Sequence, residues 1–356
     1  MEPSPGVVRR FVLPAIFVVA LFAALVWRQP GCDEQVRTWA FGGETMGTTY
    51  SVKATIKTPP VEKKDVAAAI EATLETVNNQ MSTYRPDSEL SRFNRAAKGT
   101  PFQVSPELIT VVAKAQEVAN LSGGAFDVTV GPLVNAWGFG PKKAQAPPTD
   151  TEIKQLLAKV GHSKLRFDAQ KKTLTKDTDD LYVDLSAIAK GFGVDQVAAR
   201  LEALGFEDFM VEVGGEVRAK GTNERGEPWQ IGVEKPDEST RGIQEIVSLS
   251  NMAMATSGSY RNFYEKDGER VSHTIDATTG MPIKHRLASV TVLHTDCMSA
   301  DGLATALNVL GPVRGAALAE KEGLAALFIV KGRDGRFTET VTPAFEALRA
   351  LKGRAK

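Results

Sequence analysis

Short strand-like segments follow one another closely in the middle of this 356-residue chain. Gly, Asn, Pro and Asp residues, which favour turns, separate them. The five segments are Phe209–Val213, Val217–Lys220, Trp229–Val233, Ile246–Ser250 and Met252–Thr256. Parallel neighbours need a long crossover connection between them, so this spacing indicates antiparallel pairing rather than repeated βαβ units. The pattern predicts an α+β fold with helices lying against antiparallel sheets.

Helical patterns occur on both sides of these strands. From Val66 to Asn78, apolar residues recur at spacings of four, four and three, the period of a helix with one buried face. Thr149 and Glu152 fit a capping box at the start of a short helix. Similar signals predict further elements. These are the helices Ser105–Leu121, Ser186–Leu204 and Leu303–Leu310, and the strands Leu165–Phe167, Thr173–Thr175, Leu181–Val183 and Ala288–His294.

Residues 1–32 form a separate segment. Arg9 and Arg10 precede an uncharged apolar run, Phe11–Trp27, which is long for a signal peptide and short for a transmembrane helix. We expect an uncleaved anchor in the cell inner membrane, with residues 33–356 as one domain on the periplasmic side, because positive flanks stay in the cytoplasm. A lipid anchor at Cys32 is the alternative, although Gln29–Gly31 is a poor lipidation signal.

The charge balance of the body excludes one class of partner. The whole chain has 43 basic and 43 acidic residues. Three arginines and one glutamate lie in residues 1–32, so the body has 40 basic and 42 acidic residues. No basic stripe marks a nucleic-acid surface, so nucleic acid is not an expected partner. The only cysteines are Cys32 and Cys297, and a disulfide between them is not expected because Cys32 lies beside the membrane.

One oxygen-rich pair lies at the start of the last predicted long helix. Asp301 and Thr305 are four residues apart, so a helix places both on one face. A carboxylate and a hydroxyl are hard donors that suit Mg²⁺ or Ca²⁺ better than zinc. An ordinary helix cap with a buried threonine is the alternative interpretation of this pair taken alone.

Four further segments have the composition of site-forming turns. Residues 183–191 (VDLSAIAKG) run from a predicted strand into a helix, where free N–H groups and a lysine favour an anion. Residues 255–260 (ATSGSY) offer consecutive hydroxyls, and residues 125–132 (AFDVTVGP) follow a Gly-Gly helix stop. Residues 273–280 (HTIDATTG) contain the one histidine, of four, that lies in a dense polar motif.

These motifs resemble those of the ApbE-type flavin transferases, which move FMN from FAD onto a threonine or serine hydroxyl of a target protein. The resemblance runs from Thr45–Thr48, through Met81–Tyr84, to Asp301–Thr305, with the motifs in family order over roughly 300 residues. It implies a T-fold-like ApbE domain of two intimately joined lobes with antiparallel sheets flanked by helices, and FAD lying between the lobes. The chain departs from the family at Glu216, where Asn is usual, and at Ser259, where Asp is frequent.

The resemblance also implies roles for particular residues. Ala187 would supply a backbone carbonyl to Mg²⁺ beside Asp301 and Thr305. His273 is the expected general base, and Asp276 is its expected orienter. The expected FAD-binding residues are Met46, Tyr84, Ala125, Phe126, Asp127, Asp184, Lys190, Ser257 and Ile275.

The expected activity is Mg²⁺-dependent transfer of FMN from FAD to target flavoproteins, with release of AMP. By the same resemblance, the acceptors are flavin-carrying subunits of membrane electron-transfer complexes. Two alternatives stay open at this point. One is an FAD pyrophosphatase that uses water and yields FMN and AMP, and the other is an exported FAD-binding protein without catalysis.

Overall fold

The computed structural model describes residues 36–56, 61–140, 146–236, 242–258, 263–266 and 269–352. The predicted anchor, residues 1–32, lies outside these ranges, and so does Ser259. Within the described ranges, no helix is both long and apolar enough to cross a membrane.

Eight strands form the main sheet, in the order β1-β2-β6-β7-β10-β15-β16-β17. Every neighbouring pair is antiparallel, which confirms the expected pairing. The strands are β1 (Arg37–Thr45), β2 (Thr48–Ile56), β6 (Asp208–Val213), β7 (Glu216–Lys220), β10 (Met252–Gly258), β15 (Leu287–His294), β16 (Ala325–Lys331) and β17 (Phe337–Val341).

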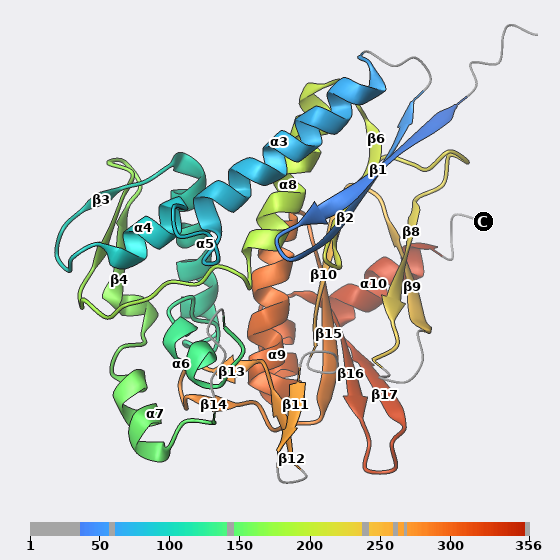
Figure 1. The fold of residues 1–356 in the computed structure, drawn as a ribbon. Helices are drawn as coiled ribbons and strands as arrows, with labels where there is room; N and C mark the ends of the chain where they lie inside the picture. Colours follow the sequence, from blue (N-terminus) through green and yellow to red (C-terminus); the bar gives the residue numbers. More distant parts are fainter. Residues whose placement is uncertain are drawn as a thin grey trace, which may run out of the picture.

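Both faces of this sheet are covered (Figure 1). Helices α8 (Ala189–Ala203) and α9 (Cys297–Lys321) pack on one face, and α3 (Lys63–Met81) packs on α8. The other face contacts α10 (Pro343–Lys352) and the hairpin of β8 (Trp229–Glu234) and β9 (Ile243–Leu249). Successive side chains of β16 point to opposite faces of the sheet. Phe328 joins the hydrophobic cluster under α9, while Leu327 and Ile329 join the cluster under α10.

A smaller group of elements lies beside the main sheet, on the left in Figure 1. It holds a three-stranded sheet of order β3-β5-β4. Its elements are α4 (Glu89–Arg95), β3 (Phe102–Gln103), α5 (Pro106–Leu121), α6 (Gly131–Ala136), α7 (Asp150–Leu157), η2 (His162–Lys164), β4 (Leu165–Asp168) and β5 (Thr173–Lys176). Two small hairpins, β11 (Phe263–Lys266) with β12 (Glu269–Ser272) and β13 (Ile275–Asp276) with β14 (Met281–Pro282), complete the fold.

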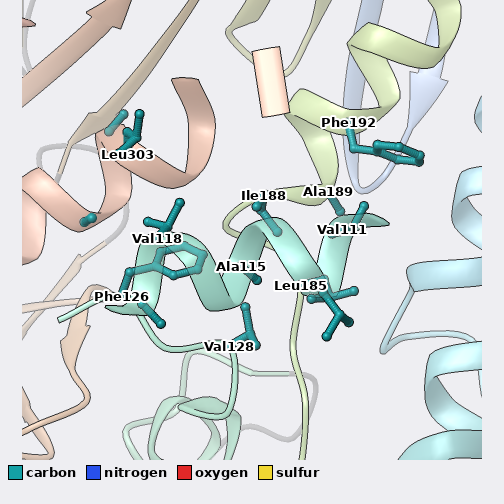
Figure 2. Close-up of a cluster of buried hydrophobic side chains, with 14 of the residues drawn as sticks. Val111, Ala115, Val118, Phe126, Val128, Leu185, Ile188, Ala189, Phe192 and Leu303 are labelled. Carbon is teal, nitrogen blue, oxygen red and sulfur yellow. The ribbon is translucent and has the colours of Figure 1, made fainter. Parts of the chain in front are cut away.

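One hydrophobic cluster joins the two groups. Figure 2 shows Val111, Ala115 and Val118 of α5 facing Ile188 at the start of α8, with Leu303 of α9 nearby. All five side chains are buried. Because this shared core continues from α5 to α9, the two groups are held in a fixed relation, and residues from both can build one site.

Most predicted elements are confirmed, including the Thr149–Glu152 capping box and the helix that starts at Pro106. Leu181–Val183 is not a strand, because the side chain of Asn94 binds both the N–H and the C=O of Val183, each at 2.8 Å, in place of a neighbouring strand. The helix expected from Ser186 begins at Ala189, after a turn. The helix expected from Leu303 begins at Cys297, where Asp296 accepts a cap hydrogen bond from the Ser299 N–H at 2.7 Å.

Candidate functional site

A groove of about 1180 Å³ lies where the smaller group meets α8, α9 and the main sheet. Twelve of the fourteen residues expected at the site line it. They are Tyr84, Ala125, Phe126, Asp127, Asp184, Ala187, Lys190, Ser257, His273, Ile275, Asp301 and Thr305. Met46 and Asp276 do not line this groove. Segments more than 220 residues apart in the chain therefore meet in one cavity.

The predicted metal pair lies on α9. Asp301 is only 4% exposed, and Thr305 follows it by one turn, with both facing the groove. The carboxylate already has two neighbours, because Oδ2 accepts a hydrogen bond from the Gly191 N–H at 3.0 Å and Oδ1 lies 3.7 Å from Lys190 Nζ. The Gly191 N–H near the start of α8 therefore binds Asp301, and it is not free for a phosphate as the helix-start prediction implied.

Lys190 lies between two buried carboxyl groups. Its Nζ is 3.0 Å from Glu216 Oε2 on β7, in addition to its contact with Asp301. Burial, together with the charge of Asp301, raises the pKa of Glu216 to about 8, although Lys190 opposes that rise. Burial also lowers the pKa of Lys190, but the two carboxylates outweigh it and leave that pKa above its ordinary value. Lys190 is therefore a fixed positive charge at the groove wall.

Two glycines allow β7 to reach Lys190. Gly214 and Gly215 form the two-residue turn between β6 and β7, with φ of 59° and 104°, which only glycine adopts without strain. A Cβ on Gly214 would lie 2.8 Å from Thr48 Cγ2 and 3.2 Å from Lys190 Cδ. The turn therefore packs directly on the stem of Lys190 and places Glu216 beside its amine.

A third glycine lets α8 and α9 approach each other. A Cβ on Gly191 would overlap the carbonyl oxygen of Cys297 and lie 2.8 Å from Asp301 Cβ. Gly193, two residues later, is also buried, but its added Cβ would meet mainly the terminal methyl of Met46, at 2.8 Å. Backbone cannot yield as a flexible side chain can, so the two positions differ in what they tolerate.

We expect Gly191→Ala to lower the free energy of unfolding by about 1–3 kcal/mol or more, because it forces the two helices apart. Gly193→Ala is the matched control, and its cost should stay below about 1.5 kcal/mol, since Met46 can adopt another rotamer. Denaturant unfolding of both variants measures the difference. Equal costs at the two positions would contradict the close helix contact at Gly191.

The turn before α8 carries two further expected residues. The backbone N–H of Asp184 donates to the Val128 carbonyl at 2.7 Å, which ties this turn to the smaller group. Asp184 Oδ1 accepts a hydrogen bond from the Ser186 N–H at 2.9 Å, so the carboxylate shapes the turn that ends in Ala187. Both Asp184 and Ala187 line the groove.

Two residues that the sequence placed in FAD binding, Phe126 and Asp127, mainly contact other parts of the protein. Phe126 borders the groove, but it is only 2% exposed, and its ring packs in the hydrophobic core (Figure 2). Both oxygens of the Asp127 carboxylate accept hydrogen bonds within the protein. Oδ1 accepts hydrogen bonds from the N–H and the hydroxyl of Thr129, both at 2.7 Å, and Oδ2 accepts one from the His162 N–H at 2.7 Å.

His273 lines the groove from the link between β12 and β13. Its ring contacts the edge of Phe139, with centroids 6.2 Å apart, and Phe139 stacks on Tyr264 at 5.3 Å. Asp276 does not line the groove, although its neighbours Ile275 and Ala277 do. Its Oδ1 accepts hydrogen bonds from the N–H and the hydroxyl of Thr278, at 2.8 and 2.6 Å, so the structure uses this carboxylate to form a turn.

Met46 belongs to an adjoining cavity of about 1350 Å³. It is in the turn between β1 and β2, and its φ of 49° is unusual for a bulky side chain. Such a conformation persists only where the surroundings impose it, and it is frequent at functional sites. The two cavities share Tyr84, Asp184, Ser186 and Lys190, and Tyr84 is 70% exposed at their junction.

Ser257 lies on β10 and is held from α9. Its Oγ accepts a hydrogen bond from Asn308 Nδ2 at 3.2 Å, and Asn308 is fully buried. The sequence interpretation missed Asn308, although its place seven residues after Asp301 puts it on the same helix face as Asp301 and Thr305. It also left Glu216 without a role, and no sequence signal indicated Phe139.

The donors expected to hold a metal are all oxygens. In the part of the chain that the structure describes, no group of three or more His, Cys, Asp or Glu side chains could hold a metal ion. Mg²⁺ does not need such a group, because it usually binds one or two carboxylates and keeps waters and substrate phosphates as its other ligands. Asp301 and Thr305, with the Ala187 carbonyl, fit a cation bound in that way.

Known proteins match this chain along most of its length. The ApbE family model matches residues 46–328. An FAD:protein FMN transferase from Vibrio cholerae is 49% identical over 93% of this chain and 98% of its own length, and one from Haemophilus influenzae is 44% identical over 96% and 99%.

Solved structures agree with the sequence matches. The flavin transferase ApbE from Vibrio cholerae superposes with a TM-score of 0.82 at 49% identity, covering 88% of this chain and 99% of that one. The apo form of Pseudomonas stutzeri flavinyl transferase ApbE gives 0.81 at 41% identity, covering 88% and 97%. With its antiparallel α+β fold, its groove and these matches, the chain belongs to the ApbE family.

Proposed function

We propose that this protein transfers FMN from FAD to a threonine or serine hydroxyl of an acceptor protein and releases AMP. The relatives described above are named FAD:protein FMN transferases. The observation that supports it most is the groove. It brings together the positively charged side chain of Lys190, the oxygen donors Asp301 and Thr305, and His273.

Lys190 is the residue suited to binding the diphosphate. Its positive charge is held at the groove wall by Glu216 and Asp301, so it does not have to be ordered when an anion arrives. Asp301, Thr305 and the Ala187 carbonyl would hold Mg²⁺ beside it. Mg²⁺ bound there would neutralise charge on the phosphates and on the leaving AMP.

In the reaction, the acceptor oxygen forms a bond to the phosphorus of the FMN half of FAD. The bond from that phosphorus to the bridging oxygen breaks, and AMP leaves with that oxygen. The proton of the acceptor hydroxyl goes to His273, the one histidine that lines the groove. Tyr84 and Met46, at the junction and in the adjoining cavity, are suited to contacting the rings of FAD.

The protein's location and acceptors are part of the same proposal. The apolar run Phe11–Trp27 after Arg9 and Arg10 supports an anchor in the inner membrane with the body in the periplasm. The near-neutral body has no strong field with which to steer distant partners. We therefore expect the acceptors in the same membrane, and the resemblance to flavin transferases implies that they are flavin-carrying subunits of electron-transfer complexes.

A direct test incubates the full chain with FAD, Mg²⁺ and an exported flavoprotein subunit. We expect the acceptor to gain the mass of FMN, with no gain after its target threonine is replaced by alanine. EDTA should abolish labelling, and added Mg²⁺ should restore it. Free FMN and AMP without labelled acceptor would instead identify an FAD pyrophosphatase, and unchanged FAD would identify a binding protein.

A further inference from the structure

Asp195 lies outside the groove, but it connects the three elements that carry the central charged residues of the site. Those residues are Lys190 on α8, Glu216 on β7 and Asp301 on α9. Asp195 is itself on α8, and its side chain is only 12% exposed. It does not line either cavity.

One carboxylate makes three contacts to two other elements. Asp195 Oδ1 accepts a hydrogen bond from the Cys297 N–H at 3.0 Å, and Oδ2 accepts one from the Met298 N–H at 2.9 Å, both at the start of α9. Oδ1 also accepts from Nη1 of Arg218 on β7 at 2.7 Å. Charge-assisted bonds of this kind are stronger than neutral ones.

These contacts are close in sequence to the groove residues. Cys297 precedes Asp301 by four residues, so the bonded N–H lies one helical turn before the metal-site carboxylate. Arg218 follows Glu216 by two residues, so both side chains point to the same face of β7. A shift of α9 or β7 relative to α8 would therefore change where Asp301 and Glu216 stand beside Lys190.

We infer that Asp195 is a positioning residue that fixes the arrangement of Lys190, Glu216 and Asp301. The inference rests on the proposed function, in which Asp301 holds a divalent cation. The carboxylate is required because an asparagine would turn its NH₂ group toward one of the two α9 N–H groups, donor against donor, and would lose the charge opposite Arg218.

The chain offers a matched control on the same helix. Asp296 also caps α9, and its carboxylate contacts Ser299, whose N–H lies at 2.7 Å, and His294, whose Nδ1 lies at 2.8 Å. These partners are within three residues of it in the chain, so Asp296 does not connect α9 to α8 or β7. Asp296→Asn therefore removes a cap charge without removing the link between the elements.

The test is a titration of Mn²⁺ into the full chain, followed by electron paramagnetic resonance, with FAD present and no acceptor. Mn²⁺ prefers the same oxygen donors as Mg²⁺. We expect Asp195→Asn to weaken Mn²⁺ binding by about 10–100-fold, the usual cost of losing a group that orients a metal ligand. Asp296→Asn should stay within about threefold of the wild type, because the partners of Asp296 are its own neighbours in the chain. Thermal unfolding of both variants compares their stability losses.

Two outcomes would overturn the inference while leaving the proposed function standing. One is Mn²⁺ affinity in Asp195→Asn equal to that of the wild type, and the other is equal weakening in both variants. If Asp195→Asn does not fold, Arg218→Gln replaces it, because this change removes only the tie to β7, and unchanged Mn²⁺ affinity there would also overturn the inference. A wild-type chain that labels acceptors but binds no Mn²⁺ would refute the metal site itself.

Discussion

An Asp301→Asn variant is expected to lose FMN transfer by about 10³-fold or more in kcat/KM. A bound cation supplies several kcal/mol of stabilisation to the transferring phosphoryl group, and each 1.36 kcal/mol corresponds to a factor of ten. The fold should survive, because the asparagine oxygen can still accept the hydrogen bond from Gly191. Rates of acceptor labelling at several Mg²⁺ concentrations measure the effect.

The matched control for Asp301→Asn is the same substitution at Asp296, the residue that caps the start of α9. It should retain transfer within a few-fold, since Asp296 lines neither cavity. Circular dichroism and FAD binding establish that both variants are folded. Wild-type turnover in Asp301→Asn would remove Asp301 from the metal site and leave Lys190 as the main charge on the diphosphate.

His273→Ala is expected to slow transfer by about 10²–10⁴-fold, the usual contribution of a general base. FAD affinity should change little, because the ring contacts Phe139 at the groove wall and Lys190 stays in place. The fall in wild-type activity on the acid side, where a base is protonated, should disappear in the variant. Single-turnover labelling across pH measures both effects.

Two comparisons separate proton transfer from packing at His273. His273→Gln keeps much of the side-chain volume but cannot act as a base, so it should be as slow as His273→Ala. His294→Ala is the control histidine, since His294 ends β15 outside both cavities and pairs with Asp296. Near-normal activity in His273→Gln, or equal losses of FAD affinity and turnover, would make His273 a packing or binding residue.

The outcome for three of the four expected carboxylates shows where prediction from the sequence stops. Asp301, Asp127 and Asp276 all lie in polar motifs of similar appearance. Only Asp301 presents its carboxylate to the groove beside a lysine, whereas Asp127 and Asp276 bind backbone and threonine groups two residues ahead in Asx-type turns. A threonine two residues after an aspartate is the signal that could have indicated those turns.

Local patterns in the sequence determined the element types, the antiparallel pairing and the stripe of Asp301 and Thr305 on one helix face. These follow from neighbours a few residues apart, since helix periodicity, turn residues and caps act over short range. Family resemblance added the remaining site residues. The extended segment 181–183 was misjudged because its partner, Asn94, is 89 residues away.

Only the tertiary structure decided how those residues are used. Lys190 is held between Glu216 and Asp301 because Gly214 and Gly215 let β7 approach α8 and Gly191 lets α9 approach it. Phe126 is buried because it packs in the hydrophobic cluster that α5 and neighbouring elements form. The contacts of Asp195 likewise join distant residues, since Arg218 on β7 is 23 positions away and Cys297 on α9 is 102 positions away. Side-chain direction and burial depend on which distant backbone lies opposite, and short-range patterns carry no record of that contact.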